Sequence, residues 1–324
     1  MRNITVKMVT AYLLTILLLI FLNFLLQRLL PGDAIIAMYS GHEVVMTDEL
    51  YAELVSRHGL DLPLHEQFLT YLSELAHGDL GYSYICHAST ADLIMDALPW
   101  TLLLMGTAFL LSAVVGIVLG VESSWRRGRR FDRSLLAFML LLDGFHSLVI
   151  GIIALAIFCW HFGWFPSSGA MTSYLSTGGI GHIRDVIWHL VLPLATLTLS
   201  MIPGDYLLIR NSMMLTIREP YVLTARAKGI RERRIKYLHA ARNAILPFTT
   251  RIGVRLAHLI TGMIFIETIF AYPGLGLLTY NAISNRDLPL MQGILTVSVI
   301  LVLLINIVVD LLYQKIDLRV GYAY

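Results

Sequence analysis

Recurring apolar runs, each close to the length that crosses a lipid bilayer, constrain this chain more than any other feature. A helix needs about 20 predominantly apolar residues to cross the hydrocarbon core. The runs lie near 8–28, 100–122, 134–160, 186–209, 248–270 and 292–313. Only 14% of the residues are charged, against about 25% in typical soluble proteins. The sequence therefore predicts an all-α, polytopic membrane protein with about six transmembrane helices.

The stretch between the first two runs, residues 31–98, is predicted to be a folded external loop. It is strongly acidic and almost free of Lys and Arg. Thr47 is suited to cap one amphipathic helix, and Pro63 precedes a second. Gly59 and Gly78 are suited to end these helices in a left-handed conformation. The loop is either a platform for an extracytoplasmic binding protein or a cap over the membrane helices, and one role does not exclude the other.

Positive charge predicts the side of the membrane on which each connection lies. Lys and Arg gather before the first run, in 126–133, in 213–247 and after the last run. Connections rich in Lys and Arg stay in the cytoplasm, so both termini are expected there, in a bacterial or archaeal cell membrane. No small-x-small cleavage site follows the first run, which predicts an uncleaved helix. The predicted organisation is a first transmembrane helix in 1–30, the external loop in 31–98 and a transmembrane core in 99–324.

Small residues and prolines within the runs predict how the helices pack. Gly116 and Gly120 have the small-xxx-small spacing that allows two helices to approach closely. Pro193 and Pro203 are expected to bend the run that contains them.

The segment 213–247 is the longest strongly basic segment of the chain. Pro220 suits the first turn of a helix, where its missing N–H costs nothing. Gly229 suits the end of that helix, and a second helix is expected over 231–244. Ala225, Ala227 and Gly229 would form a face of small residues that another surface can approach closely. An ordinary basic cytoplasmic loop remains the alternative, because membrane orientation also requires positive charge.

The order of residues in this segment resembles a known family. The pattern Tyr221-x-x-Thr224-Ala-Arg-Ala-Lys-Gly229, followed by His239-x-x-Arg242-Asn-Ala-x-x-Pro247, resembles the EAA loop of permease subunits in binding-protein-dependent ABC importers. It is most similar to the B-type subunit of the dipeptide, oligopeptide and nickel permeases. The Glu-Ala-Ala of the general pattern is here Leu223-Thr-Ala. Leu30-Pro-Gly-Asp and Gly78-Asp-Leu-Gly also resemble that family's external signatures, so the resemblance extends over nearly the whole chain.

The resemblance implies a type I ABC importer permease fold and a role for the segment, hereafter the EAA-type loop (213–247). Its first helix would be the coupling helix that docks on an ATPase subunit. The residues implied in docking are Tyr221, Thr224, Ala225, Arg226, Ala227, Lys228, Gly229 and Ile230. The implied partners are a second permease subunit, two ATP-binding subunits, an extracytoplasmic solute-binding protein and the lipid bilayer, with no nucleic acid. ATP and Mg²⁺ would bind the partner ATPases, and this chain would bind no cofactor.

The resemblance implies a di- or oligopeptide as the expected solute, and the same family implies nickel or a metal chelate as the alternative. The eleven histidines are scattered without paired spacing, and the two cysteines, Cys86 and Cys159, have no metal-ligand spacing. We therefore predict no metal site and no disulfide. The chain contains no P-loop and neither of the hydrolase motifs His-Glu-x-x-His and Gly-x-Ser-x-Gly. It is expected not to be an enzyme, and an ATP-independent secondary transporter is the remoter alternative.

Ionisable residues within apolar runs are costly and are candidates for the translocation pathway. The candidates are Asp143, His146, Asp205 and Glu267, beside His258 and Asp310. Asp143 and His146 are spaced to share one helix face, where they either contact a cation or a peptide amine or satisfy each other in the interior. Glu267 either lines the pathway or accepts hydrogen bonds from a nearby loop.

Overall fold

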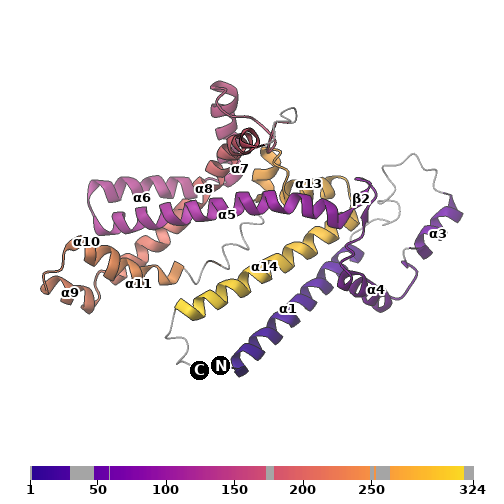
Figure 1. Ribbon diagram of the computed structural model, residues 1–324, viewed down its shortest axis with the longest axis horizontal. Helices are drawn as coiled ribbons and strands as arrows, with labels where there is room; N and C mark the ends of the chain where they lie inside the picture. Colours follow the sequence, from indigo (N-terminus) through magenta and orange to yellow (C-terminus); the bar gives the residue numbers. More distant parts are fainter. Residues whose placement is uncertain are drawn as a thin grey trace. The chain divides into compact units, whose positions relative to one another are not determined.

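The computed structural model describes residues 2–29, 47–57, 59–172, 179–248, 252 and 263–316. These residues are mostly helical (Figure 1), as predicted. The chain divides into two compact units. The first contains residues Met1–Pro99 and Gly274–Ile305, and the second contains Trp100–Pro273 and Asn306–Tyr324. The candidate His258 and the external signature at 30–33 lie outside the described residues.

Four predicted spans are confirmed as long apolar helices. They are α1 (Arg2–Leu29), α5 (Thr90–Trp125), α8 (Ile180–Thr216) and α14 (Leu288–Ile316). Each contains a segment long and apolar enough to cross a membrane. α8 continues through both Pro193 and Pro203. Most of the predicted run near 248–270 lies outside the described residues, and its described part, 263–269, is helical.

The third predicted span, 134–160, is broken rather than continuous. α6 (Arg130–Asp143) and α7 (Ser147–Ala154), which continues into η1 (Leu155–His161), are bent by 98°. Gly144 ends α6, and His146 caps α7 with an extended backbone at φ −66° and ψ 146°. His146 Nδ1 accepts the Leu148 N–H at 3.3 Å, so a side-chain cap starts the new helix here.

In the first unit, the predicted helix caps are confirmed. Thr47 Oγ1 accepts the Leu50 N–H at the start of α3 (Asp48–Arg57). α4 (Leu64–Ala76) follows Pro63 directly. Gly59 and Gly78 both have positive φ, 61° and 80°, which glycine adopts without strain. Local sequence signals therefore set the limits of both helices.

Side chains from α1, α4 and α14 meet in the interior of the first unit. Phe68 of α4 contacts the Phe24 ring at a centroid distance of 5.3 Å. Asn23 donates to Thr296 Oγ1 at 2.8 Å, and Tyr71 shares a hydrogen bond of the same length with that hydroxyl. α4 thus adds an aromatic contact and a hydroxyl group to this interior, where polar groups need hydrogen-bond partners.

A short hairpin and another helix complete the first unit. β1 (Tyr82–Ser83) pairs antiparallel with β2 (Ala88–Ser89). The Ser83 hydroxyl hydrogen-bonds to the buried Asp287 carboxylate, just before α14. α13 (Leu275–Ser284) packs in an apolar cluster with the start of α5 and the start of α14; its buried members are Ile94, Ala97, Leu275, Ala282, Leu290 and Ile294.

In the second unit, α5 and α8 approach closely at the predicted small-xxx-small pair. A Cβ added at Gly116 would overlap Asp205 Cβ, and one added at Gly120 would lie 2.9 Å from Ile209 Cβ. Since real Cβ atoms do not approach so closely, only glycine fits at these two positions without a shift. Figure 1 shows α6 running back alongside α5 from the turn that joins them. The EAA-type loop lies near that turn, as contacts described below establish.

Candidate functional site: the EAA-type loop and its supports

The first helix of the EAA-type loop has the predicted limits. α9 (Pro220–Ala227) has Pro220 in its first turn. Gly229 has φ 72°, and its N–H donates to the Arg226 carbonyl at 2.9 Å. The Ile230 N–H reaches back to the Ala225 carbonyl at 3.3 Å. This is the glycine-terminated helix end that the sequence predicts.

The second half of the loop is helical over the predicted range but not uniform. It consists of α10 (Glu232–Arg234), η2 (Ile235–Ala241) and α11 (Arg242–Ala244). η2 is a π-helix, a wider turn often found at functional positions. Propensity does not distinguish a π-helical turn from an α-helical one, so the sequence predicts the helix but not this turn.

One side of α9 is buried, and this corrects the predicted face of small residues. Val222 and Ala225 are buried together with Ile235, Ala240 and Val121 of α5. Ala225 therefore packs against this chain's own helices, whereas Ala227 and Gly229 are exposed. Tyr221 and Leu223 are also exposed, at 39% and 54%. The exposed surface of α9 is thus partly apolar and is not formed by small residues alone.

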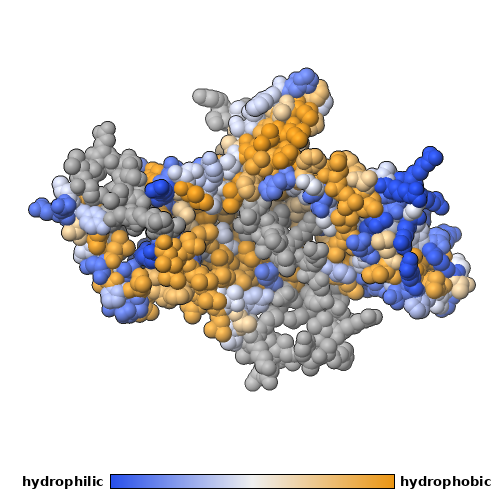
Figure 2. Space-filling model, turned by 180° about the vertical axis from the view of Figure 1, so that it is seen from behind, coloured by the Kyte–Doolittle hydropathy of each residue, from blue (hydrophilic) through white to orange (hydrophobic). Residues whose placement is uncertain are grey.

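Positive charge surrounds this open surface. Lys228, Arg231, Arg233 and Arg234 are all exposed. Arg226 forms an ion pair with Glu232 at 3.3 Å, and its guanidinium lies 5.2 Å from the Trp125 ring centroid. Figure 2 shows hydrophilic atoms gathered around α9 and α10, beside mostly hydrophobic helix surfaces. An exposed apolar patch rimmed by charge is typical of a protein–protein contact.

Glu122, near the end of α5, holds the returning half of the loop. Its carboxylate accepts hydrogen bonds from Lys236 and from the Tyr237 hydroxyl, both in η2. Arg126, the first residue after α5, adds an ion pair to the Glu122 carboxylate at 3.4 Å. The Lys236 side chain is only 10% exposed, so this pair is screened by water less than a surface pair would be.

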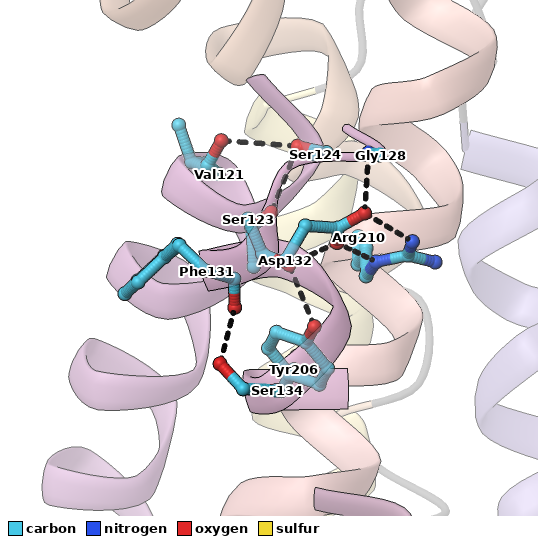
Figure 3. A network of polar contacts seen from close by, with 10 residues as sticks. Val121, Ser123, Ser124, Gly128, Phe131, Asp132, Ser134, Tyr206 and Arg210 are labelled. Atoms are coloured by element: carbon cyan, nitrogen blue, oxygen red, sulfur yellow. Dashed lines mark hydrogen bonds and ion pairs between the residues drawn. The ribbon is translucent and has the colours of Figure 1, made fainter. Parts of the chain in front are cut away.

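Asp132 is the centre of a second buried network, drawn in Figure 3. Arg210 of α8 donates from Nε to Asp132 Oδ1 at 2.9 Å and from Nη2 to Oδ2 at 3.1 Å. The Ser123 hydroxyl donates to Oδ1 at 2.6 Å, and the Gly128 N–H donates to Oδ2 at 3.0 Å. The Tyr206 hydroxyl in turn bonds Ser123 Oγ at 2.7 Å. The carboxylate therefore connects α5, α6, α8 and the turn between α5 and α6.

Asp205 and Glu267, two of the pathway candidates, are fully buried within the second unit. Asp205 lies where α5 and α8 are closest, against Gly116. Glu267 Oε1 accepts the Thr101 hydroxyl at 2.8 Å, and its carbonyl accepts the Tyr272 N–H at 2.8 Å. The second contact is made by the backbone carbonyl of Glu267, so the loop-supporting role of its side chain stays a prediction. A role in the pathway remains a prediction for both residues.

The structure corrects the proposed pairing of Asp143 and His146. Asp143 is the last residue of α6, and His146 caps α7 after the 98° bend, so they do not share a helix face. Both are exposed, which excludes a buried pair within this chain. His146 instead meets the Phe265 ring edge-on at 5.0 Å. The helix break, absent from the prediction, separates the two residues.

Among the residues that the structure describes, no group of three or more His, Cys, Asp and Glu side chains is placed to hold a metal ion. The sequence prediction missed the supporting residues Glu122, Ser123, Asp132, Tyr206 and Arg210. A signal existed for Arg210, a charge directly after the apolar run near 186–209. Asp132 lies among five arginines at 126–133. A single acidic residue there is indistinguishable, from sequence alone, from an ordinary member of a charged loop.

These features define a multi-helix membrane protein with an exposed basic loop, and comparison with known proteins gives its family. The profile described as "Binding-protein-dependent transport system inner membrane component" matches residues 112–322. This chain belongs to that family and is a multi-pass inner-membrane transport component rather than an enzyme. Membership implies ATPase and binding-protein partners, and it excludes the ATP-independent secondary transporter.

Relatives match over nearly the whole chain. The di/tripeptide transport system permease protein DppB of Pseudomonas aeruginosa is 35% identical, with 93% of each chain covered. A putative peptide permease protein of Brucella suis is 36% identical, with 92% of each covered. Among solved structures, the MetNI methionine ABC transporter in inward-facing conformations aligns with a TM-score of 0.57 at 18% identity, covering 69% of this chain and 96% of that one. That likeness confirms the predicted type I ABC importer permease fold.

Proposed function

We propose that this chain is the B-type permease subunit of an ABC importer for di- or oligopeptides. The observation that carries the proposal is the match, over more than nine-tenths of the chain, to relatives named as peptide permeases. Those names favour a peptide over nickel or a metal chelate as the solute. The solute would be delivered by an extracytoplasmic binding protein and would cross the membrane between this chain and a second, homologous permease subunit.

The EAA-type loop would dock on one of two ATPase subunits. Tyr221 and Leu223 supply exposed apolar contact area on α9, and Lys228 and Arg231 supply a positive rim. An ATPase surface with a shallow apolar groove and acidic edges would complement both. In this arrangement the loop and both termini face the cytoplasm, and α3 and α4 lie on the opposite side.

Transport would proceed by alternating access. ATP binding would bring the two ATPase subunits together and pull the docked loops with them, which would open the pathway toward the binding protein. Hydrolysis would return the pathway to the inward-facing state. This chain would contribute the moving helices, and ATP and Mg²⁺ would stay in the partner subunits.

Co-purification tests the docking role. Leu223→Asp, at an exposed position of α9, should abolish co-purification of the ATPase subunits and leave this chain in the membrane. Leu69→Asp is the matched control, because Leu69 is similarly exposed, at 63% against 54% for Leu223, but lies on α4. Loss of the ATPase from the control as well, or its retention by both variants, would overturn the docking surface. Ala225 is unsuitable for this test, since it is buried and a charge there would disturb the fold.

A further inference from the structure

Two consecutive residues of α5 connect the EAA-type loop to the rest of the second unit. Glu122 binds Lys236 and Tyr237 of the loop. Ser123 binds Asp132 at the start of α6 and Tyr206 of α8. The end of α5 is therefore held on one side by the loop and on another by the network around Asp132.

The Asp132 network is the stronger of the two attachments. The carboxylate accepts four hydrogen bonds, and two of them come from the planar guanidinium of Arg210. The side chains of Asp132 and Arg210 are only 4% and 11% exposed. A bidentate, charge-assisted contact of this kind fixes both the distance and the angle between the guanidinium and the carboxylate.

The apolar contacts of the loop lead to the same helices. Val222 and Ala225 of α9 pack in one cluster with Val121 of α5 and with Ile209 and Met213 of α8. Arg210 lies between those two α8 residues in sequence, on the same stretch of helix. A displacement of the loop therefore reaches α5 and α8 directly. It reaches the start of α6 through Asp132 and, one turn further on, through apolar contacts of Leu135 and Leu136 in the cluster around Tyr206 of α8.

We propose that Asp132 and Arg210 are positioning residues for energy coupling. Their contact makes the ends of α5, α6 and α8 move with the EAA-type loop as one body, so that a pull on the loop becomes a movement of the spans. The inference rests on the proposed function, because it requires an ATPase that pulls the loop. Buried ion pairs stabilise a fold no better than apolar side chains of similar size, whereas they do fix geometry, which is what coupling through rigid elements requires.

The test separates coupling from folding by comparing a broken pair with an apolar replacement. Arg210→Met leaves Asp132 buried without its cation, whereas Asp132→Leu combined with Arg210→Met removes both charges. The complete complex, with its binding protein, is reconstituted in proteoliposomes. Uptake of a labelled dipeptide is then divided by the ATP hydrolysed over the same interval. Arg133→Met, at an exposed position one residue from Asp132, is the control.

We expect the apolar double variant to stay folded but to melt below the wild type, because Ser123 and Gly128 lose their shared acceptor. Its uptake per ATP should fall by on the order of tenfold, a typical size for coupling between two sites. Arg210→Lys keeps the positive charge but not the bidentate contact, and it should recover part of the lost uptake per ATP. Wild-type uptake per ATP in a folded double variant would overturn the inference and leave the proposed function intact. A wild-type complex without peptide-stimulated ATP hydrolysis would overturn both.

Discussion

Gly116 and Gly120 show at the scale of single residues how this fold depends on the absence of a side chain. Both face α8, where a Cβ would meet Asp205 and Ile209. Gly106, on the same helix, has nothing within 4 Å of the corresponding position. Identical substitutions at these sites should therefore have opposite effects.

Gly116→Ala should lower the free energy of unfolding by about 1–3 kcal/mol, the usual cost of overpacking a well-packed interior. Gly106→Ala should raise it by up to about 1 kcal/mol, because alanine is the better helix former. Thermal unfolding of both variants in the same detergent measures the difference. Equal melting temperatures would mean that α5 and α8 are not in close contact at Gly116.

The two ion pairs Asp132–Arg210 and Arg226–Glu232 should differ sharply in their contribution to stability. Asp132→Ala leaves a buried guanidinium without its partner and should cost about 3–5 kcal/mol. Glu232→Ala breaks a pair whose side chains are 40% and 60% exposed, and it should cost at most about 1 kcal/mol. Chemical denaturation of the purified chain distinguishes them, and a small loss for Asp132→Ala would contradict the buried network.

Residue-level prediction from the sequence succeeded where the signal is local. Thr47, Pro220 and Gly229 act on backbone groups within a few positions, so their roles follow from the order of residues alone. The partnership of Asp132 with Arg210 spans 78 positions. No periodicity carries that information, because it depends on how α6 and α8 pack.

At the scale of elements, α9 and its glycine end are the part of the candidate site that the sequence predicts best. The break between α6 and α7 is the part that it predicts worst. The apolar composition of 134–160 is that of one membrane span. Hydropathy contains no information on where a helix bends. The break is marked only by Gly144, which ends α6, and by His146, which caps α7. Glycine and histidine also occur within helices, so neither residue predicts the break.

The turn after α9 should tolerate only residues that adopt a left-handed backbone. Gly229 has φ 72° and no atom within 4 Å of a built Cβ, so any effect of substitution comes from the backbone alone. Gly229→Val should cost roughly 1–2 kcal/mol locally and reduce peptide uptake. Gly229→Asn should retain most of it, because Asn tolerates this conformation. Equal uptake by the two variants would show that the turn geometry is unimportant for transport.

For the whole molecule, the orientation in the membrane is a prediction that a native cysteine can test. Cys86 is exposed in the turn between β1 and β2. A membrane-impermeant thiol reagent should label Cys86 in cells whose inner membrane is intact, once the outer layers of the cell envelope are made permeable to the reagent. With Cys159 replaced by serine in both cases, Lys228→Cys in a Cys86→Ser background should label only after the inner membrane is made permeable. Labelling of both sites from one side would contradict the proposed topology.

ATP hydrolysis by the complete complex tests the central claim most directly. The complex would be purified through this chain, reconstituted in lipid with its binding protein, and given dipeptides and then nickel chelates. We predict that peptides stimulate hydrolysis and that nickel chelates leave it at the basal rate. Stimulation by nickel chelates alone, or no ATPase bound to this chain at all, would contradict the assignment as a peptide importer permease.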